Sequence, residues 1–205
     1  MIILDIETMP RPEGIALLPP ATAPRNLKDP AKIAAVLAEK DAERVDRAAL
    51  DPNSCIIAAI GLLDTEAGEP WVWMADAGTE QAALETAWRR LRSRSATICG
   101  FNVGWDLRVL TRRAQLVGVA YPRMELGKYK HRYIDLQQDL TFDFQEEMRP
   151  LGYWCRLFGV PHDDSIKGAD IPGLVAEGTP EAWAKVEQHL RDDLMSTAAL
   201  AKRVL

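Results

Sequence analysis

The chain has 205 residues, of which 47% are hydrophobic and 27% charged, and its formal net charge is -5. This composition indicates a folded globular domain and excludes a disordered chain. The negative charge argues against a broad, non-specific coat on nucleic acid. It does not exclude a local phosphate site, because a bound metal can supply positive charge.

Cys55, Cys99 and Cys155 lie far apart in apolar surroundings, and none belongs to a CxxC pair. This usage predicts buried thiols in a reducing compartment. No stretch has the pattern of a signal peptide or of a membrane span. We therefore expect a cytoplasmic protein without a membrane partner.

The first residues predict a buried β-strand. Ile2–Glu7 is almost continuously apolar, and residues 8–10 are expected to end the strand. Asp5 and Glu7 are two residues apart, so their side chains leave the same face. Unpaired carboxylates near the centre of a sheet cost roughly several kcal/mol, which a metal ion would offset. The alternative is that the strand ends early and both acids lie in a solvated loop.

Residues 10–52 are predicted to form an insertion after this strand. Five prolines indicate an extended surface loop over residues 10–26. The following stretch, from Asp29 to about Leu50, predicts a charged, alanine-rich helix. The position of the insertion directly after Glu7 suggests a lid or a strand guide.

The rest of the chain alternates predicted strands and helices. Strands are expected at residues 55–63, 71–74, 97–101 and 133–136. Helices are expected at residues 79–92, 106–116, 151–158, 168–178 and 179–205. This order predicts an α/β fold, a single domain over residues 1–205 in which helices flank a mixed five-stranded sheet.

Further polar residues fall at the predicted helices. Asp106 follows the turn GFNVGW and is expected at or next to a helix N-cap, where plain capping, worth about 1 kcal/mol, is the alternative to a metal role. On the last helix His189 and Asp193 are four residues apart and share a face. A solvated face with an incidental histidine is the alternative there. Asp192 is interpreted as a solvated neighbour.

Together these residues resemble the four acids of the DEDD superfamily of 3′–5′ exonucleases. LDIET at Asp5 and Glu7 is similar to the first motif of that superfamily, GFNVGWDLRVL at Asp106 to the second, and HLRDDLMSTAAL at Asp193 to the third. The segments YIDL, LGYWCRLFGVP and KGADIPGLVAEG resemble those before the third motif in members similar to family-B polymerases. The insertion resembles that of stand-alone members encoded by phages or prophages. The resemblance covers nearly the whole chain and implies a ribonuclease H-like fold.

The resemblance also implies two divalent cations, Mg²⁺ or Mn²⁺, about 3.5–4 Å apart and held by the four acids. Oxygen ligands suit such hard cations and disfavour zinc. The third motif of the superfamily carries a tyrosine four residues before the last aspartate, or a histidine five residues before it. Here His189 occupies the spacing of the tyrosine. An imidazole can accept a proton from water at neutral pH, so His189 is the expected base, although it is shorter than tyrosine.

Secondary candidates surround these motifs. Thr8 and Met9 are placed to touch the terminal nucleotide, and Asn102 to hold the turn or the substrate backbone. Residues 121–133 mix basic and aromatic side chains, which suits single-stranded nucleic acid as well as a solvated loop. Residues 162–164 (His-Asp-Asp) have no partner at ligand spacing and are interpreted as a loop.

The leading hypothesis is a metal-dependent 3′–5′ exonuclease that releases nucleoside 5′-monophosphates from DNA, with single-stranded DNA favoured. It would act alone or as the proofreading partner of a separate DNA polymerase. One alternative is an exoribonuclease on short RNA, since no motif here reads the 2′-hydroxyl. The other is a catalytically silent domain that binds nucleic acid or protein.

Overall fold

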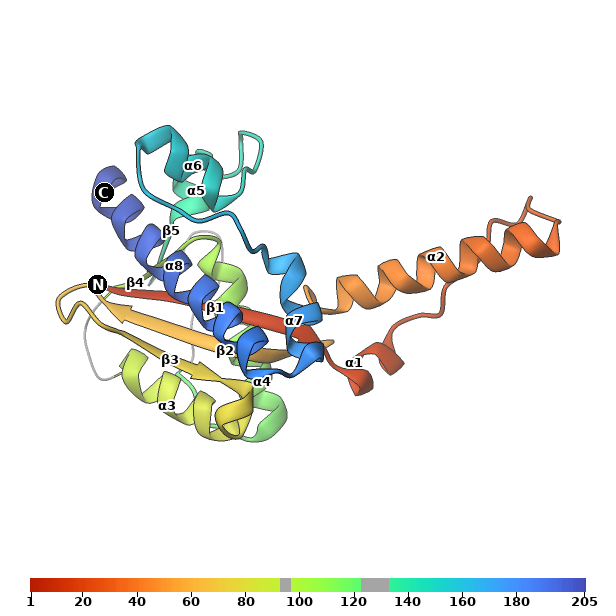
Figure 1. The fold of residues 1–205 in the computed structure, drawn as a ribbon, viewed down its shortest axis with the longest axis horizontal. Coiled ribbons are helices and arrows are strands. Elements are labelled where there is room, and N and C mark those ends of the chain that lie inside the picture. The colour runs from red at the N-terminus through yellow and green to blue at the C-terminus, as the bar shows by residue number, and fades with distance from the viewer. Residues whose placement is uncertain (93–96, 123–132) are drawn as a thin grey trace.

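Five strands form one mixed sheet in the order β3-β2-β1-β4-β5 (Figure 1). β1 pairs antiparallel with β2, and β2 with β3, whereas β4 pairs parallel with both β1 and β5. The predicted α/β class with a mixed five-stranded sheet is confirmed. The computed structural model describes residues 1–92, 97–122 and 133–205. The strands are β1 (Ile2–Pro10), β2 (Cys55–Asp64), β3 (Pro70–Met74), β4 (Ile98–Gly100) and β5 (Tyr133–Asp135).

The helices follow the predicted order closely. α2 and α8 each begin at an N-cap residue followed by proline: Asp29 accepts from Ala31 N at 3.0 Å, and Thr179 from Ala182 N at 3.1 Å. Within the described ranges, no helix is long and apolar enough to cross a membrane. The elements are α1 (Pro12–Leu17), α2 (Pro30–Ala48), η1 (Ala75–Ala77), α3 (Glu80–Arg92), α4 (Val103–Val117), α5 (Leu136–Leu140), α6 (Leu151–Phe158), η2 (Gly168–Asp170), α7 (Ile171–Glu177) and α8 (Pro180–Val204).

The sheet separates two hydrophobic cores. Because side chains alternate along β1, successive residues of this strand pack into opposite cores. Leu4 and Ile6 pack in the core that includes α3 and α4, whereas Ile3 packs in the core that includes α6, α7 and α8. Asp5 and Glu7 alternate along β1 with Leu4 and Ile6, so their side chains leave the other face of the sheet, on the side of α8. The predicted shared face of the two acids thus points toward the last helix.

A glycine lets α8 approach the sheet closely. Gly61 on β2 lies opposite Asp5 in the antiparallel register, directly below α8. A Cβ at this position would stand 2.6 Å from Leu194 Cδ1 and 3.1 Å from Leu190 Cγ. Because real Cβ contacts are longer, a side chain here would have to displace the side chains of Leu190 and Leu194.

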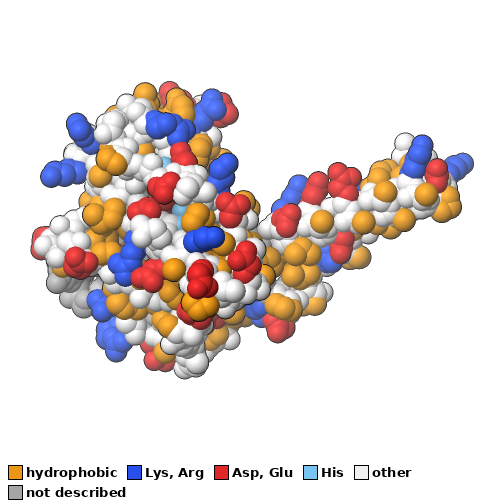
Figure 2. Space-filling view, viewed as in Figure 1, with side chains coloured by type: hydrophobic (Ala, Val, Ile, Leu, Met, Phe, Trp, Pro, Cys, Tyr) orange, Lys and Arg blue, Asp and Glu red, His pale blue; other side chains and the backbone are white. Residues whose placement is uncertain are grey.

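The insertion forms an arm that projects from the sheet (Figure 1) and carries both apolar and charged side chains (Figure 2). β1 continues to Pro10, with an irregularity after Glu7, instead of ending at residues 8–10. The extended loop predicted for residues 10–26 is wrong in part, because it contains α1. Pro12 lies in the first turn of α1, where the fixed φ of proline and its missing N–H are tolerated.

The base of the arm is fixed beside the acids of β1. Thr8 Oγ1 donates to Ala49 O at 2.7 Å, and Trp105 Nε1 donates to Leu50 O at 3.0 Å. The residues that follow α2 are therefore tied to both β1 and α4.

The three cysteines are buried thiols, as predicted. Burial raises the pKa of Cys55 and Cys155 to about 11 and that of Cys99 to about 12. They are therefore protonated at neutral pH and act as small apolar side chains in the cores.

Candidate active site

A cleft of about 1000 Å³ opens where β1, the start of α4, the loop after α6 and α8 meet. Thr8 and Asn102 line it as well, whereas Met9 is not part of this lining as far as the structure describes the chain. All five residues predicted to be catalytic line the cleft, although they come from distant parts of the sequence: Asp5, Glu7, Asp106, His189 and Asp193.

Asp106 reaches the cleft from the first turn of α4. The helix begins at Val103, so the expected N-cap position of Asp106 is wrong, and Asn102 occupies it. The Asp106 side chain is buried, and its Oδ1 accepts from Ile6 N at 3.1 Å. This hydrogen bond crosses from α4 to the middle of β1 and holds the second motif against the first.

The turn before α4 is held by Asp135, which the sequence did not single out as a site residue. Asn102 has a left-handed backbone (φ 59°), which is uncommon for a residue with a side chain. Asp135 Oδ1 accepts from Asn102 N at 2.9 Å, and Asp135 Oδ2 from Gly104 N at 3.1 Å. The turn-holding role expected of the Asn102 side chain thus belongs to Asp135. A contact between Asn102 and substrate stays a prediction.

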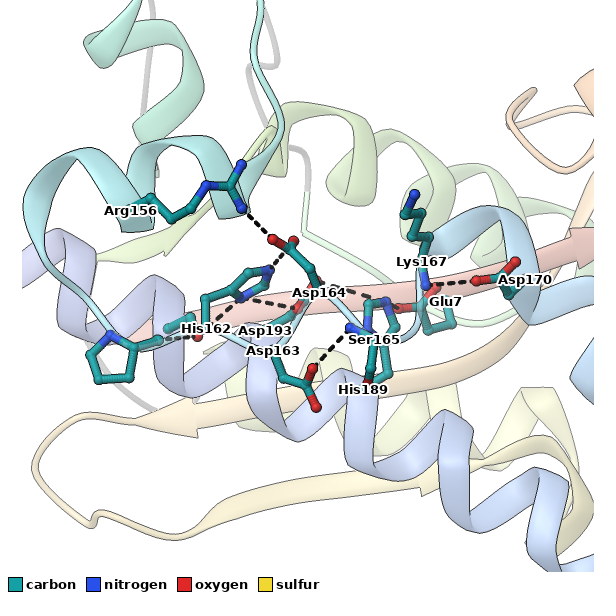
Figure 3. A network of polar contacts seen from close by, with 12 residues as sticks. Glu7, Arg156, His162, Asp163, Asp164, Ser165, Lys167, Asp170, His189 and Asp193 are labelled. Atoms are coloured by element: carbon teal, nitrogen blue, oxygen red, sulfur yellow. Dashed lines mark hydrogen bonds and ion pairs between the residues drawn. The ribbon is translucent and has the colours of Figure 1, made fainter.

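His189 and Asp193 reach the acids of β1 from one face of α8 (Figure 3). His189 Nε2 lies 3.3 Å from Glu7 Oε1 and 3.9 Å from Asp193 Oδ2. The His189 and Glu7 side chains are both nearly buried, so little water separates them. The expected shared face is therefore real, and the alternative of a solvated helix face is wrong.

His162 also belongs to the cleft, which corrects its interpretation as a residue without partners. The residue lies in a loop, as predicted, but its side chain is only 8% exposed. His162 Nε2 lies 3.1 Å from Asp164 Oδ1, and His162 Nδ1 lies 3.9 Å from Asp193 Oδ1. Asp164 in turn pairs with Arg156 of α6 (Figure 3). Nothing in the local pattern points to these contacts, because they depend on the path of the loop.

Burial and mutual repulsion dominate the electrostatics of the cleft. Burial, followed by the neighbouring carboxylates, raises the pKa of Asp5 and of Glu7 well above the usual values. Burial likewise raises the pKa of Asp106 well above its usual value. For Asp193 burial also raises the pKa, while His189 and His162 oppose the rise. The charged forms of these acids therefore require a compensating positive charge.

No family model and no curated protein sequence matches this chain. The resemblance to the DEDD superfamily therefore rests only on the three sequence motifs and on the residues that line the cleft.

The donor set of the cleft fits a hard divalent cation. Four carboxylates face one space, and Asp193 Oδ1 is buried without a hydrogen-bond partner in the part of the chain that the structure describes. As the side chains stand, no three or more His, Cys, Asp or Glu residues among those described are arranged to hold a metal ion. Binding therefore requires the carboxylates to turn toward a common point.

The raised carboxylate pKa values predict how the stability of the protein depends on pH. Groups with a higher pKa in the folded than in the unfolded state stabilise the fold below their unfolded pKa, and this stability is lost as the pH rises through the folded pKa. Without divalent cations we expect the melting temperature to fall as the pH rises above the usual carboxyl range of about 4. Millimolar Mg²⁺ or Mn²⁺ should restore most of the loss. Thermal unfolding in chelator and in Mg²⁺ measures both effects, and identical curves would contradict the prediction.

The remaining candidates have different outcomes. Thr8 lines the cleft, and its hydroxyl proton is donated to Ala49 O. The basic and aromatic patch predicted at residues 121–133 falls mostly outside the described residues. Asp192 is absent from the lining of the cleft, and its Oδ1 accepts from Gln188 Nε2 at 2.9 Å on the surface of α8.

Proposed function

We propose that this chain is a metal-dependent 3′–5′ exonuclease with a ribonuclease H-like fold, which hydrolyses DNA from its 3′ end to nucleoside 5′-monophosphates. One observation carries the proposal: Asp5, Glu7, Asp106, His189 and Asp193, chosen from the sequence, all line one cleft. The mixed sheet with a core on each face is compatible with the proposed fold. The proposed domain spans residues 1–205.

In this proposal the four carboxylates hold two Mg²⁺ or Mn²⁺ ions. Such ions acidify water and neutralise the charge that develops on phosphate and on the departing 3′ oxygen. Asp106 keeps its orientation through the hydrogen bond to Ile6 N, and Asp135 fixes the turn that carries it. His189 accepts the proton of the attacking water, for which it must exchange its contact with Glu7 for one with that water.

Two cationic side chains suit the substrate backbone. Arg156 and Lys167 line the same cleft as the acids, near its surface. Phosphate contacts from such side chains position a nucleic acid without reading its sequence. We therefore propose single-stranded DNA as the substrate, threaded with its 3′ end toward Asp5.

A digestion series tests this function. Single-stranded DNA labelled at its 5′ end should shorten stepwise in Mg²⁺ or Mn²⁺ and remain intact in chelator. Circular single-stranded DNA of the same composition is the matched control, because it has no 3′ end and should survive. RNA of the same sequence, in parallel, separates the exoribonuclease alternative. An intact linear strand in every cation would contradict the proposal, as would cleavage of the circle.

A catalytically silent binding domain is the second candidate. It is favoured by the side-chain arrangement, in which no three ligand residues of the described chain form a ready metal site. This candidate predicts binding of nucleic acid that is unaffected by chelator. The exonuclease predicts that binding of Mn²⁺ is measurable by calorimetry before any substrate is added.

A further inference from the structure

His162 is held rigidly at both ring nitrogens. Its Nε2 lies 3.1 Å from Asp164 Oδ1, and its Nδ1 lies 3.2 Å from Ser196 Oγ. Ser196 Oγ donates to Pro161 O at 3.1 Å. Which of Ser196 Oγ and His162 Nδ1 donates depends on which ring nitrogen carries the proton. The ring therefore has a defined orientation on the side of the cleft opposite Glu7.

This ring and that of His189 enclose the carboxylate of Asp193. His162 Nδ1 lies 3.9 Å from Asp193 Oδ1, and His189 Nε2 lies 3.9 Å from Asp193 Oδ2. Both distances are too long for hydrogen bonds but too short for an intervening water. Within the described residues Asp193 Oδ1 is buried and has no hydrogen-bond partner. The orientation of this carboxylate is thus limited by two imidazoles and remains available to a ligand.

α6 sets the position of the ring through Asp164. Arg156 pairs with Asp164 Oδ2 (Figure 3). The Asp164 carboxylate also packs against α6 at Gly152. A Cβ at position 152 would lie 2.2 Å from Asp164 Oδ1. Any larger residue at position 152 would therefore have to displace the carboxylate of Asp164, the partner of His162.

We propose that His162 is a positioning residue that keeps the Asp193 carboxylate facing the cleft, from where it turns to a cation, with Asp164 and Gly152 setting the position of His162. The inference rests on the proposed cation site and adds to it a residue outside the three motifs. Partners that orient a metal ligand from behind change metal affinity about 10- to 100-fold when removed.

The test is Mn²⁺ affinity of the full chain, measured by calorimetry and by electron paramagnetic resonance without substrate. His162→Ala should weaken Mn²⁺ binding about 10- to 100-fold. His162→Asn places an amide nitrogen near the position of Nδ1 and should recover much of the affinity. His162→Gln places its amide nearer the position of Nε2 and should recover little. This difference between two amides of similar polarity is not expected from a general loss of stability.

A second pair of variants leaves His162 itself unchanged. Gly152→Ala should displace Asp164 and weaken Mn²⁺ binding in the same range as His162→Ala. Gly173→Ala in α7 is the matched control, because a Cβ there meets nothing within 4 Å. It should leave Mn²⁺ binding unchanged. Circular dichroism establishes that each variant is folded, and Gly152→Ala decides the question if His162→Ala unfolds.

The outcomes separate this inference from the proposed function. Tight Mn²⁺ binding by the wild type together with unchanged binding by folded Gly152→Ala and His162→Ala would overturn the positioning role alone. Equal recovery by His162→Asn and His162→Gln would also overturn it. Absence of Mn²⁺ binding by the wild type would remove the proposed cation site, and this inference with it.

Discussion

Replacing Asp193 with asparagine should reduce cation-dependent digestion of 3′ ends by roughly 10³-fold or more, because several kcal/mol of transition-state stabilisation would be lost. The amide keeps the shape of the side chain but not the charge that attracts a cation. Asp5→Asn should have the same effect. The measurement is the rate of shortening of 5′-labelled single-stranded DNA at saturating Mg²⁺.

Asp192→Asn is the matched control for this change. Asp192 is adjacent to Asp193 in α8, but it pairs with Gln188 and lies outside the lining of the cleft. We expect it to retain wild-type turnover. Without cations, Asp5→Asn should also raise the melting temperature, since it removes one charge from a buried group of like charges. Full activity of Asp5→Asn or Asp193→Asn would remove the metal assignment.

Replacing His189 with alanine should lower turnover roughly 10²- to 10⁴-fold, the usual contribution of a general base. His189 Nε2 lies 3.3 Å from Glu7 Oε1, so the ring already lies beside an acid of β1. His189→Gln separates two roles. Glutamine can replace the polar contact with Glu7, but its amide cannot accept a proton from water.

For a base, His189→Gln should be as slow as His189→Ala at saturating Mn²⁺, whatever the Mn²⁺ affinity of each variant. Single-turnover digestion and calorimetry on the same preparations supply these two values. Turnover of His189→Gln near that of the wild type would show that the residue only holds Glu7 in place, and the base would have to be sought elsewhere in the cleft.

The predictable part of the site is the part governed by local periodicity. Alternation along β1 placed Asp5 and Glu7 on one face, and the helical repeat placed His189 and Asp193 on another. The helix predicted from residue 179 agrees with α8, which Thr179 caps. Which of these faces meet is a question of topology, and a short resemblance in three motifs was sufficient to anticipate it.

The unpredictable part depends on loop paths and on backbone conformations that the sequence does not favour. His162 reaches Asp193 only because the chain after α6 turns back across the cleft. The start of α4 was placed too late, because Asn102 adopts a left-handed conformation that is stabilised by Asp135, a residue of another strand. Long-range hydrogen bonds of this kind leave no periodic signal in the sequence.

The close packing of α8 on the sheet involves a residue that is not one of the four acids. His189 and Asp193 lie on the helix whose Leu190 and Leu194 side chains pack directly over Gly61, on a strand that carries none of the four acids. The packing of α8 on the sheet therefore depends in part on a position that carries no functional group. A substitution at Gly61 would thus affect the site through the packing of α8, whereas a substitution of an acid removes a charged group directly.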